Sequence, residues 1–145
     1  QLVGEGSGDE QASYSDHAPD GRRVIWHLAL AADWDQAVAS GSYAVSTRGL
    51  TLEQVGFVHC SYAHQLAGVA RLFYADESAP LTLLGIDPRR LAAAGIEVRA
   101  EPGDPARADS ERFPHVYGAI PVSAVREAHA ASVIDGVLVA PTWDA

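Results

Sequence analysis

Residues 56–61, GFVHCS, place an imidazole, a thiol and a hydroxyl at three consecutive positions. A histidine beside a cysteine could form a thiol nucleophile, because the imidazole can take the thiol proton. The stretch nevertheless has the composition of a short buried strand, in which side chains alternate between two faces. His59 and Cys60 are therefore expected to point apart. Cys60 is interpreted as a small buried hydrophobic residue, whereas Phe57, His59 and Ser61 are expected to share one face.

Two other predicted strands carry a histidine in a similar position. In VIWHLAL, His27 shares a face with apolar or small neighbours, and in FPHVYG, His115 shares one with Phe113 and Tyr117. If these faces and that of His59 line one cleft, the cleft has aromatic walls and several imidazoles, which suits a nucleotide or another small molecule. The alternative for each histidine is a hydrogen-bonded structural role.

A metal site is a further interpretation of the same three side chains. His27, His59 and His115 could bind zinc and leave a fourth position open. The long stretches of chain between them match no local ligand signature, so a metal is not favoured. The remaining histidines, His17, His64 and His129, are expected outside the site.

The residue pattern predicts an α+β domain with a mixed or split β-sheet flanked by short helices. Asp33, Thr51 with Gln54, Ser61, and Asp87 with Pro88 are the expected helix starts. Residues 101–112 form the one long polar loop, and residues 122–133 fit a strand or a helix equally well. Strands are expected at residues 24–30, 56–61, 81–87, 96–100, 113–121 and in IDGVLVAP near the C-terminus.

Length and composition set the outer limits. We expect a disordered acidic tail over residues 1–22, one domain over residues 23–140, and a short C-terminal tail over residues 141–145. The formal net charge is −9 and all ten basic residues are arginines, which disfavours nucleic acid as a partner but leaves a small anion open. One cysteine and the lack of a long apolar run favour a cytoplasmic protein away from membranes. The oligomeric state stays open.

Five motifs in this order resemble the domain of unknown function 952 family: IWHLA followed by DW, GFVHCS, LLGIDPRRL, EVRAEP and FPHVYG. The resemblance covers roughly residues 24–128. That family looks like a member of the ADP-ribosyltransferase superfold, near the tRNA 2′-phosphotransferases. The resemblance implies a split-sheet clamp that binds NAD in its cleft.

The resemblance implies that His27, His59 and Ser61 lie in the pocket, and the enzyme hypothesis adds further candidates. His59, Glu101 and His115 are the candidate catalytic residues. The candidate ligand-binding residues are His27, Phe57, Ser61, Arg99, Arg112 and Tyr117. The chain departs from the phosphotransferase pattern at Leu28-Ala29, where Gly-Thr is usual, and in EQVGF, which lacks an arginine. Two functions therefore remain: an NAD-dependent transferase, or a non-catalytic small-molecule-binding module on the same fold.

Overall fold

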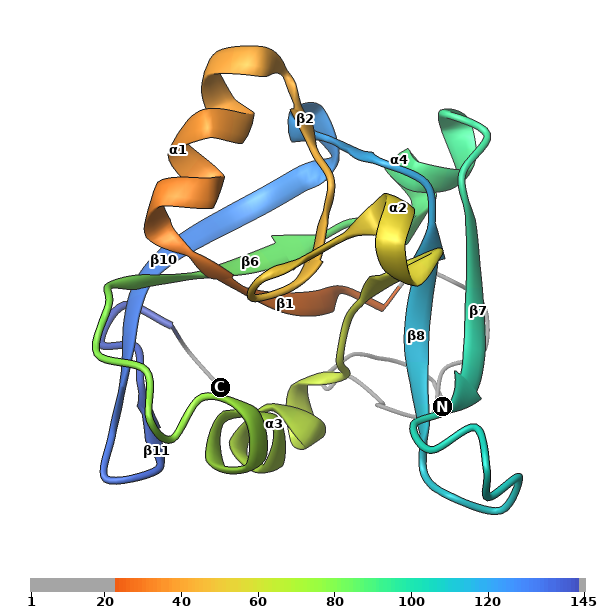
Figure 1. Ribbon diagram of the computed structural model, residues 1–145. Helices are drawn as coiled ribbons and strands as arrows, with labels where there is room; N and C mark the ends of the chain where they lie inside the picture. Colours follow the sequence, from red (N-terminus) through yellow and green to blue (C-terminus); the bar gives the residue numbers. More distant parts are fainter. Residues whose placement is uncertain (1–22, 144–145) are drawn as a thin grey trace, which may run out of the picture.

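The computed structural model describes residues 23–143. Its central feature is a curled antiparallel sheet in the order β1-β6-β10-β11 (Figure 1). β6 (Leu81–Ile86) lies in the middle and pairs with β1 (Ile25–Leu30) on one side and β10 (Val125–Ile134) on the other. The apolar run LTLLGI is almost wholly buried in that position, as expected of a central strand.

A second sheet has the order β5-β8-β7, with β8 (Arg112–Tyr117) between β5 (Val58–His59) and β7 (Glu97–Pro102). The two sheets meet at one bridge, where the backbones of Trp26 and Ser61 exchange hydrogen bonds of 2.8 and 2.7 Å. All strand pairs named here are antiparallel. Short helices and antiparallel strands together fit the expected α+β class, while an ADP-ribosyltransferase type of sheet is not shown.

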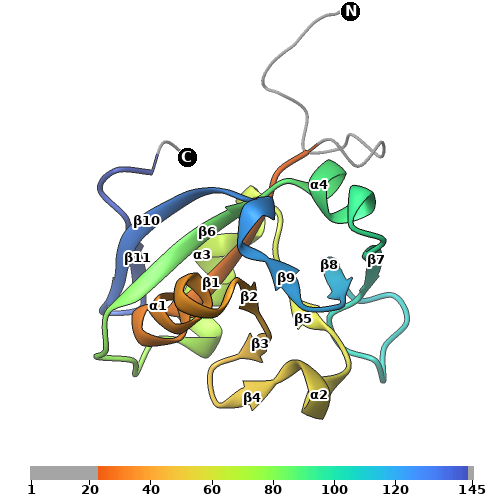
Figure 2. The ribbon, with the colours of Figure 1, turned by 90° about the horizontal axis from the view of Figure 1, so that it is seen from above.

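Short elements complete the domain, as the view from above shows (Figure 2). Two small strand pairs join β2 (Ser42–Tyr43) to β9 (Ile120–Pro121) and β3 (Val45–Thr47) to β4 (Leu50–Thr51). The helices are α1 (Ala31–Ser40), α2 (Leu52–Val55), α3 (Leu66–Phe73) and α4 (Pro88–Ala93). No helix among residues 23–143 is long and apolar enough to cross a membrane.

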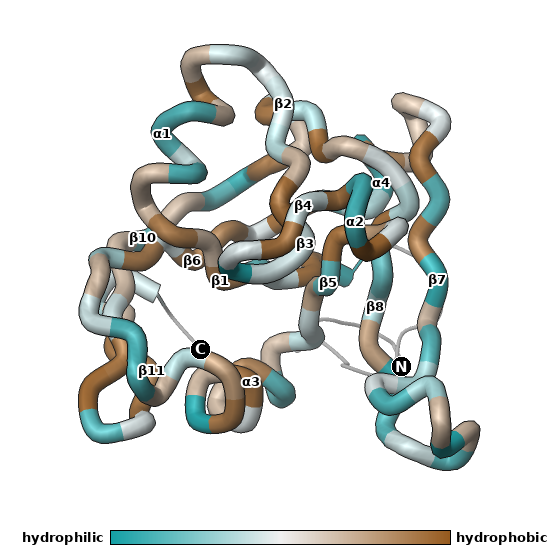
Figure 3. The backbone as a smooth tube through the Cα atoms, viewed as in Figure 1, coloured by the Kyte–Doolittle hydropathy of each residue, from teal (hydrophilic) through white to brown (hydrophobic). Residues whose placement is uncertain are grey.

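Hydrophobic residues pack on both faces of the main sheet, and the alternation along β1 decides which face each residue joins. Ile25 and Ala29 belong to one core cluster with Val58, whereas Trp26 and Leu28 belong to a second cluster with residues of α3. In Figure 3, hydrophobic and hydrophilic residues alternate along the edge strand β7. The buried Cys60 lies in the first cluster, as its position predicts.

Several local predictions are confirmed and others are wrong. Thr51 and Gln54 form the predicted capping box, and Asp87 caps α4, with its carboxylate accepting from the Arg89 amide. Asp33 is not an N-cap, because α1 already begins at Ala31. Ser61 does not cap a helix either, because its backbone pairs with Trp26 and a short 3-10 turn, Ala63–Gln65, comes before α3.

The C-terminal half differs from expectation in two places. The ambiguous residues 122–133 form a 3-10 turn, Val122–Ala124, followed by the long strand β10. β10 then turns back into β11 (Val137–Val139) through Asp135-Gly136, both with positive φ, the geometry of a tight hairpin.

The predicted tail over residues 1–22 lies outside the described residues. Trp143 packs on Trp26, with 5.3 Å between ring centroids.

Candidate functional site

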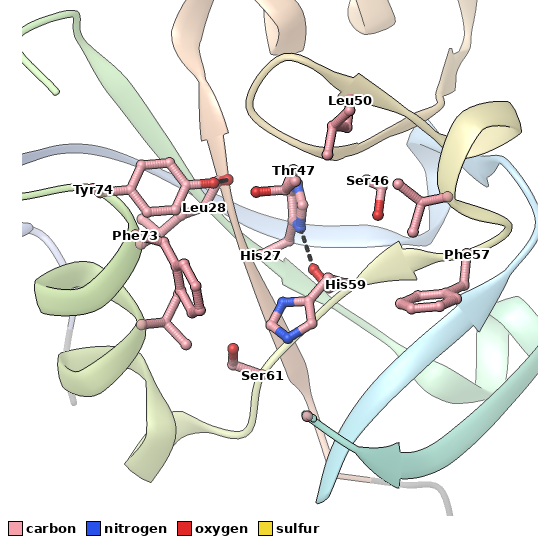
Figure 4. A pocket seen from close by; sticks show the side chains of 13 residues that line it. His27, Leu28, Ser46, Thr47, Leu50, Phe57, His59, Ser61, Phe73 and Tyr74 are labelled. Atoms are coloured by element: carbon pink, nitrogen blue, oxygen red, sulfur yellow. Dashed lines mark hydrogen bonds between the residues drawn. The ribbon is translucent and has the colours of Figure 1, made fainter. Parts of the chain in front are cut away.

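A cavity of about 240 Å³ opens beside the junction of the two sheets (Figure 4). The junction supplies His27, His59 and Ser61, and the surrounding elements supply mainly apolar side chains. The lining residues are His27, Leu28, Ser46, Thr47, Leu50, Val55, Phe57, His59, Ser61, Val69, Phe73, Tyr74 and Gly103. None of them is an arginine, aspartate or glutamate, so the cavity is uncharged apart from what its histidines carry.

His27 lies at the back of the cavity with both ring nitrogens engaged. Its Nδ1 donates to the carbonyl of His59 at 2.7 Å, and its Nε2 accepts from the hydroxyl of Tyr43 at 2.8 Å, since a carbonyl can only accept. Burial lowers the pKa of His27 from 6.5 to about 4 despite the raising effect of the bond to His59. His27 is therefore a neutral residue that fixes the position of β5.

His59 differs from His27 because its ring nitrogens have no hydrogen-bond partner among the described residues. Figure 4 shows its ring standing in the cavity between Ser61 and Phe57. Burial, and then the nearby imidazoles of His115 and His27, lower the pKa of His59 to about 4. At neutral pH the ring thus presents one donor and one acceptor to the cavity.

The β3–β4 hairpin and the end of α3 form the opposite walls of the cavity. Arg48 at the hairpin tip donates to Glu77 at 2.8 Å and to Asp76 at 2.5 Å, which ties the hairpin to the segment after α3. Tyr74 donates to the carbonyl of Leu28 at 3.0 Å and so joins that segment to β1. The walls are therefore cross-linked to each other and to the sheet.

A second polar cluster lies next to the cavity on β8 and β7. His115 is the direct cross-strand neighbour of His59, and their ring centroids are 5.4 Å apart. Its Nδ1 lies 2.9 Å from an oxygen of Glu101, which also accepts from the hydroxyl of Tyr117 at 2.5 Å. These hydrogen bonds lower the pKa of Glu101, that from Tyr117 most and that from His115 next. Glu101 is thus a carboxylate held by two neighbours.

Phe57 separates this cluster from the cavity. Its ring stacks on that of His115, with centroids 3.9 Å apart and planes 13° from parallel, and it also lines the cavity. The sequence grouped His27, His59 and His115 around one space. The structure places His27 and His59 in the cavity and His115 behind Phe57.

The two predicted arginines do not line the cavity. Arg99 donates to Glu97 at 2.9 Å, and its guanidinium lies 4.3 Å from the ring centroid of Tyr117. Arg112 donates to the carbonyl of Ala100 at 3.2 Å. Charge complementarity for a phosphate is therefore absent from the cavity walls.

No three histidine, cysteine, aspartate or glutamate side chains within residues 23–143 are arranged to hold a metal ion. For the histidine triad the physical reason is plain. Both nitrogens of His27 are already bonded to protein groups, and Nδ1 of His115 is bonded to Glu101.

Sequence reasoning missed the hairpin and helix residues of the cavity, chiefly Ser46, Thr47, Leu50 and Phe73. One available signal was the Arg48-Gly49 pair between two short extended stretches, because glycine often marks a turn. In the structure Gly49 has the positive φ of such a turn. Phe73 and Leu50 are also largely exposed for apolar residues, at 54% and 45%. That exposure appears only in three dimensions.

The family model for DUF952, a protein of unknown function, matches residues 28–128. Three solved structures of protein CC0527 from Caulobacter crescentus are similar to this chain. The crystal structure has a TM-score of 0.63 and 25% identity, and the match covers 80% of this chain and 93% of that one. The crystal structure of a double mutant has a TM-score of 0.63 and 26% identity, and its match covers 80% of this chain and 93% of that one. The solution structure has a TM-score of 0.60 and 25% identity, and its match covers 79% of this chain and 90% of that one.

No curated protein matches the sequence. None of these likenesses supports the ADP-ribosyltransferase part of the resemblance. The five motifs of the sequence predict this family, and the family match confirms that prediction. The chain belongs to the DUF952 family of proteins of unknown function.

Proposed function

We propose that the domain binds a small, uncharged ring-containing molecule in the cavity at His59. The observation that carries this proposal is the unpartnered neutral imidazole of His59 in an otherwise apolar space. A neutral imidazole offers a donor on one edge of its ring and an acceptor on another, so it can form a hydrogen bond with either the C=O or the N–H of a carboxamide or a heterocyclic base. Phe57 and Phe73 offer apolar faces to a flat ring.

The cavity volume and charge restrict how a nucleotide could bind. About 240 Å³ is below the usual range for sites that enclose drug-sized ligands. A pyrophosphate buried against these walls would lack a cationic partner, which is costly. The nicotinamide ring of NAD is a pyridinium cation, so these uncharged walls favour free nicotinamide over the nicotinamide end of NAD.

Calorimetric and thermal-shift titrations with nicotinamide, NAD and ADP-ribose test this proposal. Nicotinamide is expected to raise the melting temperature more than NAD does, and ADP-ribose, whose one base is adenine, reports whether the cavity accepts a heterocyclic base in place of the carboxamide ring. His59→Ala should abolish the response. His64→Ala is the matched control, because His64 is an exposed histidine outside the cavity. The absence of any heat or shift with all three ligands at millimolar concentration would contradict the proposal.

Transferase chemistry on NAD is the second candidate function. The observation in its favour is the imidazole of His115 held against the carboxylate of Glu101, an arrangement that can orient a general base. A time course of nicotinamide release from NAD by the purified protein distinguishes the two functions. Release that is lost in Glu101→Gln supports the enzyme, and binding without release supports the non-catalytic module.

A further inference from the structure

Ser46 is the buried middle residue of β3 and is only 1% exposed. Its hydroxyl has no hydrogen-bond partner among residues 23–143. A buried strand position is usually apolar, because a hydroxyl taken out of water without a partner is unfavourable. The serine at this position therefore calls for an explanation other than packing.

The hydroxyl of Ser46 opens onto the cavity and is not sealed in the core. Ser46 lines the cavity, and Figure 4 shows its oxygen pointing away from the hairpin toward that space. Within residues 23–143, the side-chain atoms that are both enclosed and unpartnered belong to Arg23 and His115. The Ser46 hydroxyl is thus buried, unpartnered and within reach of a molecule that fills the cavity.

A β-bulge at Ser46 sets the direction of this side chain. The residues on either side of Ser46 pair with Leu50 and Thr51, which are consecutive in β4. Ser46 is therefore an extra residue of the kind that re-aims a side chain beside a site. The ion pairs of Arg48 hold the tip of the same hairpin against the segment after α3. The hydroxyl consequently occupies a fixed position in the cavity wall.

Ser46 and His59 reach the cavity from different elements. His59 and Ser61 lie two positions apart on one extended segment, so they share a face and border the same side of the space. Ser46 comes from the β3–β4 hairpin, and in the view of Figure 4 it lies across the His59 ring from Ser61. A flat molecule held at His59 by one edge would present another edge to Ser46.

We propose that Ser46 is a specificity-determining residue of the cavity, whose hydroxyl donates a hydrogen bond to an acceptor on a second edge of the bound ring. This inference rests on the proposed function. It adds the ligand class: a flat, uncharged ring with polar atoms on two edges, such as a pyridine carboxamide. A ring with a single polar edge would leave the Ser46 hydroxyl unsatisfied.

Nicotinamide and benzamide are probes of nearly the same size that differ in one acceptor. Both carry a carboxamide on a flat ring, and benzamide has a C–H where nicotinamide has the ring nitrogen. Calorimetric titration of the wild type is expected to show about fivefold tighter binding of nicotinamide, the worth of one net hydrogen bond. His59→Ala should abolish the binding of both probes.

Ser46→Ala should remove or reverse the preference for nicotinamide, because the ring nitrogen then enters the cavity without a donor. Ser61→Ala should weaken the binding of both probes alike and keep the preference, since Ser61 lies on the side of His59. Ser42→Ala is the matched control, because Ser42 is an exposed serine on the strand β2, outside the cavity. It should change neither affinity.

Thermal unfolding of Ser46→Ala provides a test that needs no ligand. A hydroxyl without a protein partner is dispensable to the fold, so the melting temperature of the variant should equal or exceed that of the wild type. A melting temperature lower by several degrees would show that the hydroxyl stabilises the domain, and would overturn the inference.

The titrations separate this inference from the proposed function. A preference for nicotinamide that survives in Ser46→Ala, or that is lost only in Ser61→Ala, overturns the role of Ser46. Equal binding of both probes to the wild type overturns it while the proposed function stands. Binding of neither probe at millimolar concentration overturns both.

Discussion

The ring of His27 is bonded to the backbone carbonyl of His59, not to its side chain, at 2.7 Å. This contact joins β1 to β5 beside the single bridge between the two sheets. Both ring nitrogens of His27 are engaged, whereas the imidazole of His59 has no hydrogen-bond partner within residues 23–143. The two histidines of the cavity are thus different in kind, one structural and one available to a ligand.

The stability of the domain should fall as pH drops from about 6.5 to about 4. Because burial lowers the pKa of His27 to about 4, the unfolded chain binds a proton in this window that the folded chain does not. The resulting loss for this one residue is at most about 3 kcal/mol. Urea unfolding across this pH range measures it. His27→Gln should flatten the slope relative to the wild type, and an unchanged slope would contradict the assignment.

Ligand affinity should respond to pH through His59. Its pKa of about 4 keeps the ring neutral at higher pH, so nicotinamide affinity is expected to be flat from pH 8 to well below 6. Affinity should fall as pH approaches 4, where protonation replaces the acceptor with a second donor. Calorimetry at several pH values checks this. A decline centred near 6.5, the ordinary pKa of histidine, would show that burial does not perturb His59.

Arg48→Ala should loosen the wall of the cavity. Arg48 ties the β3–β4 hairpin to Asp76 and Glu77, with its own side chain 29% exposed. Losing both pairs is expected to cost up to about 1 kcal/mol of unfolding free energy and to weaken ligand binding several-fold. Arg107→Ala is the matched control, because Arg107 makes one long contact to Asp109 in an exposed loop. Equal effects of the two variants on binding would argue against the role of the hairpin.

Gly85→Ala should destabilise the domain through β1. A Cβ at Gly85 would lie 2.8 Å from a ring carbon of Trp26, the residue that pairs with Ser61. We expect a loss of about 1–3 kcal/mol by thermal or denaturant unfolding, as for other overpacked cores. Gly68→Ala in α3 meets nothing within 4 Å and should instead add up to about 1 kcal/mol through helix propensity. Similar values for both variants would contradict the close packing of Trp26.

Alternation along the strands predicted which of these side chains share a face. It separated His59 from Cys60, and the structure confirms that Cys60 is buried while His59 and His115 pair across β5 and β8. The capping box at Thr51 and the Asp87-Pro88 helix start were equally readable, because they depend on residues a few positions apart. Residues 122–133 could not be assigned, because their pairing with β6 is a long-range contact.

By itself the sequence determined which residues share a strand face, where α2 and α4 begin, and the family of the chain, since these depend on short-range patterns. Only the tertiary structure decided that His27 is satisfied, that Phe57 stacks on His115, and that Arg99 and Arg112 stay off the cavity walls. The reason is that the alternation of side chains along one strand determines which side of the sheet a residue faces, but not how far it lies from a residue on another strand. That distance is set at the bridge between Trp26 and Ser61, where the two sheets meet beside the cavity.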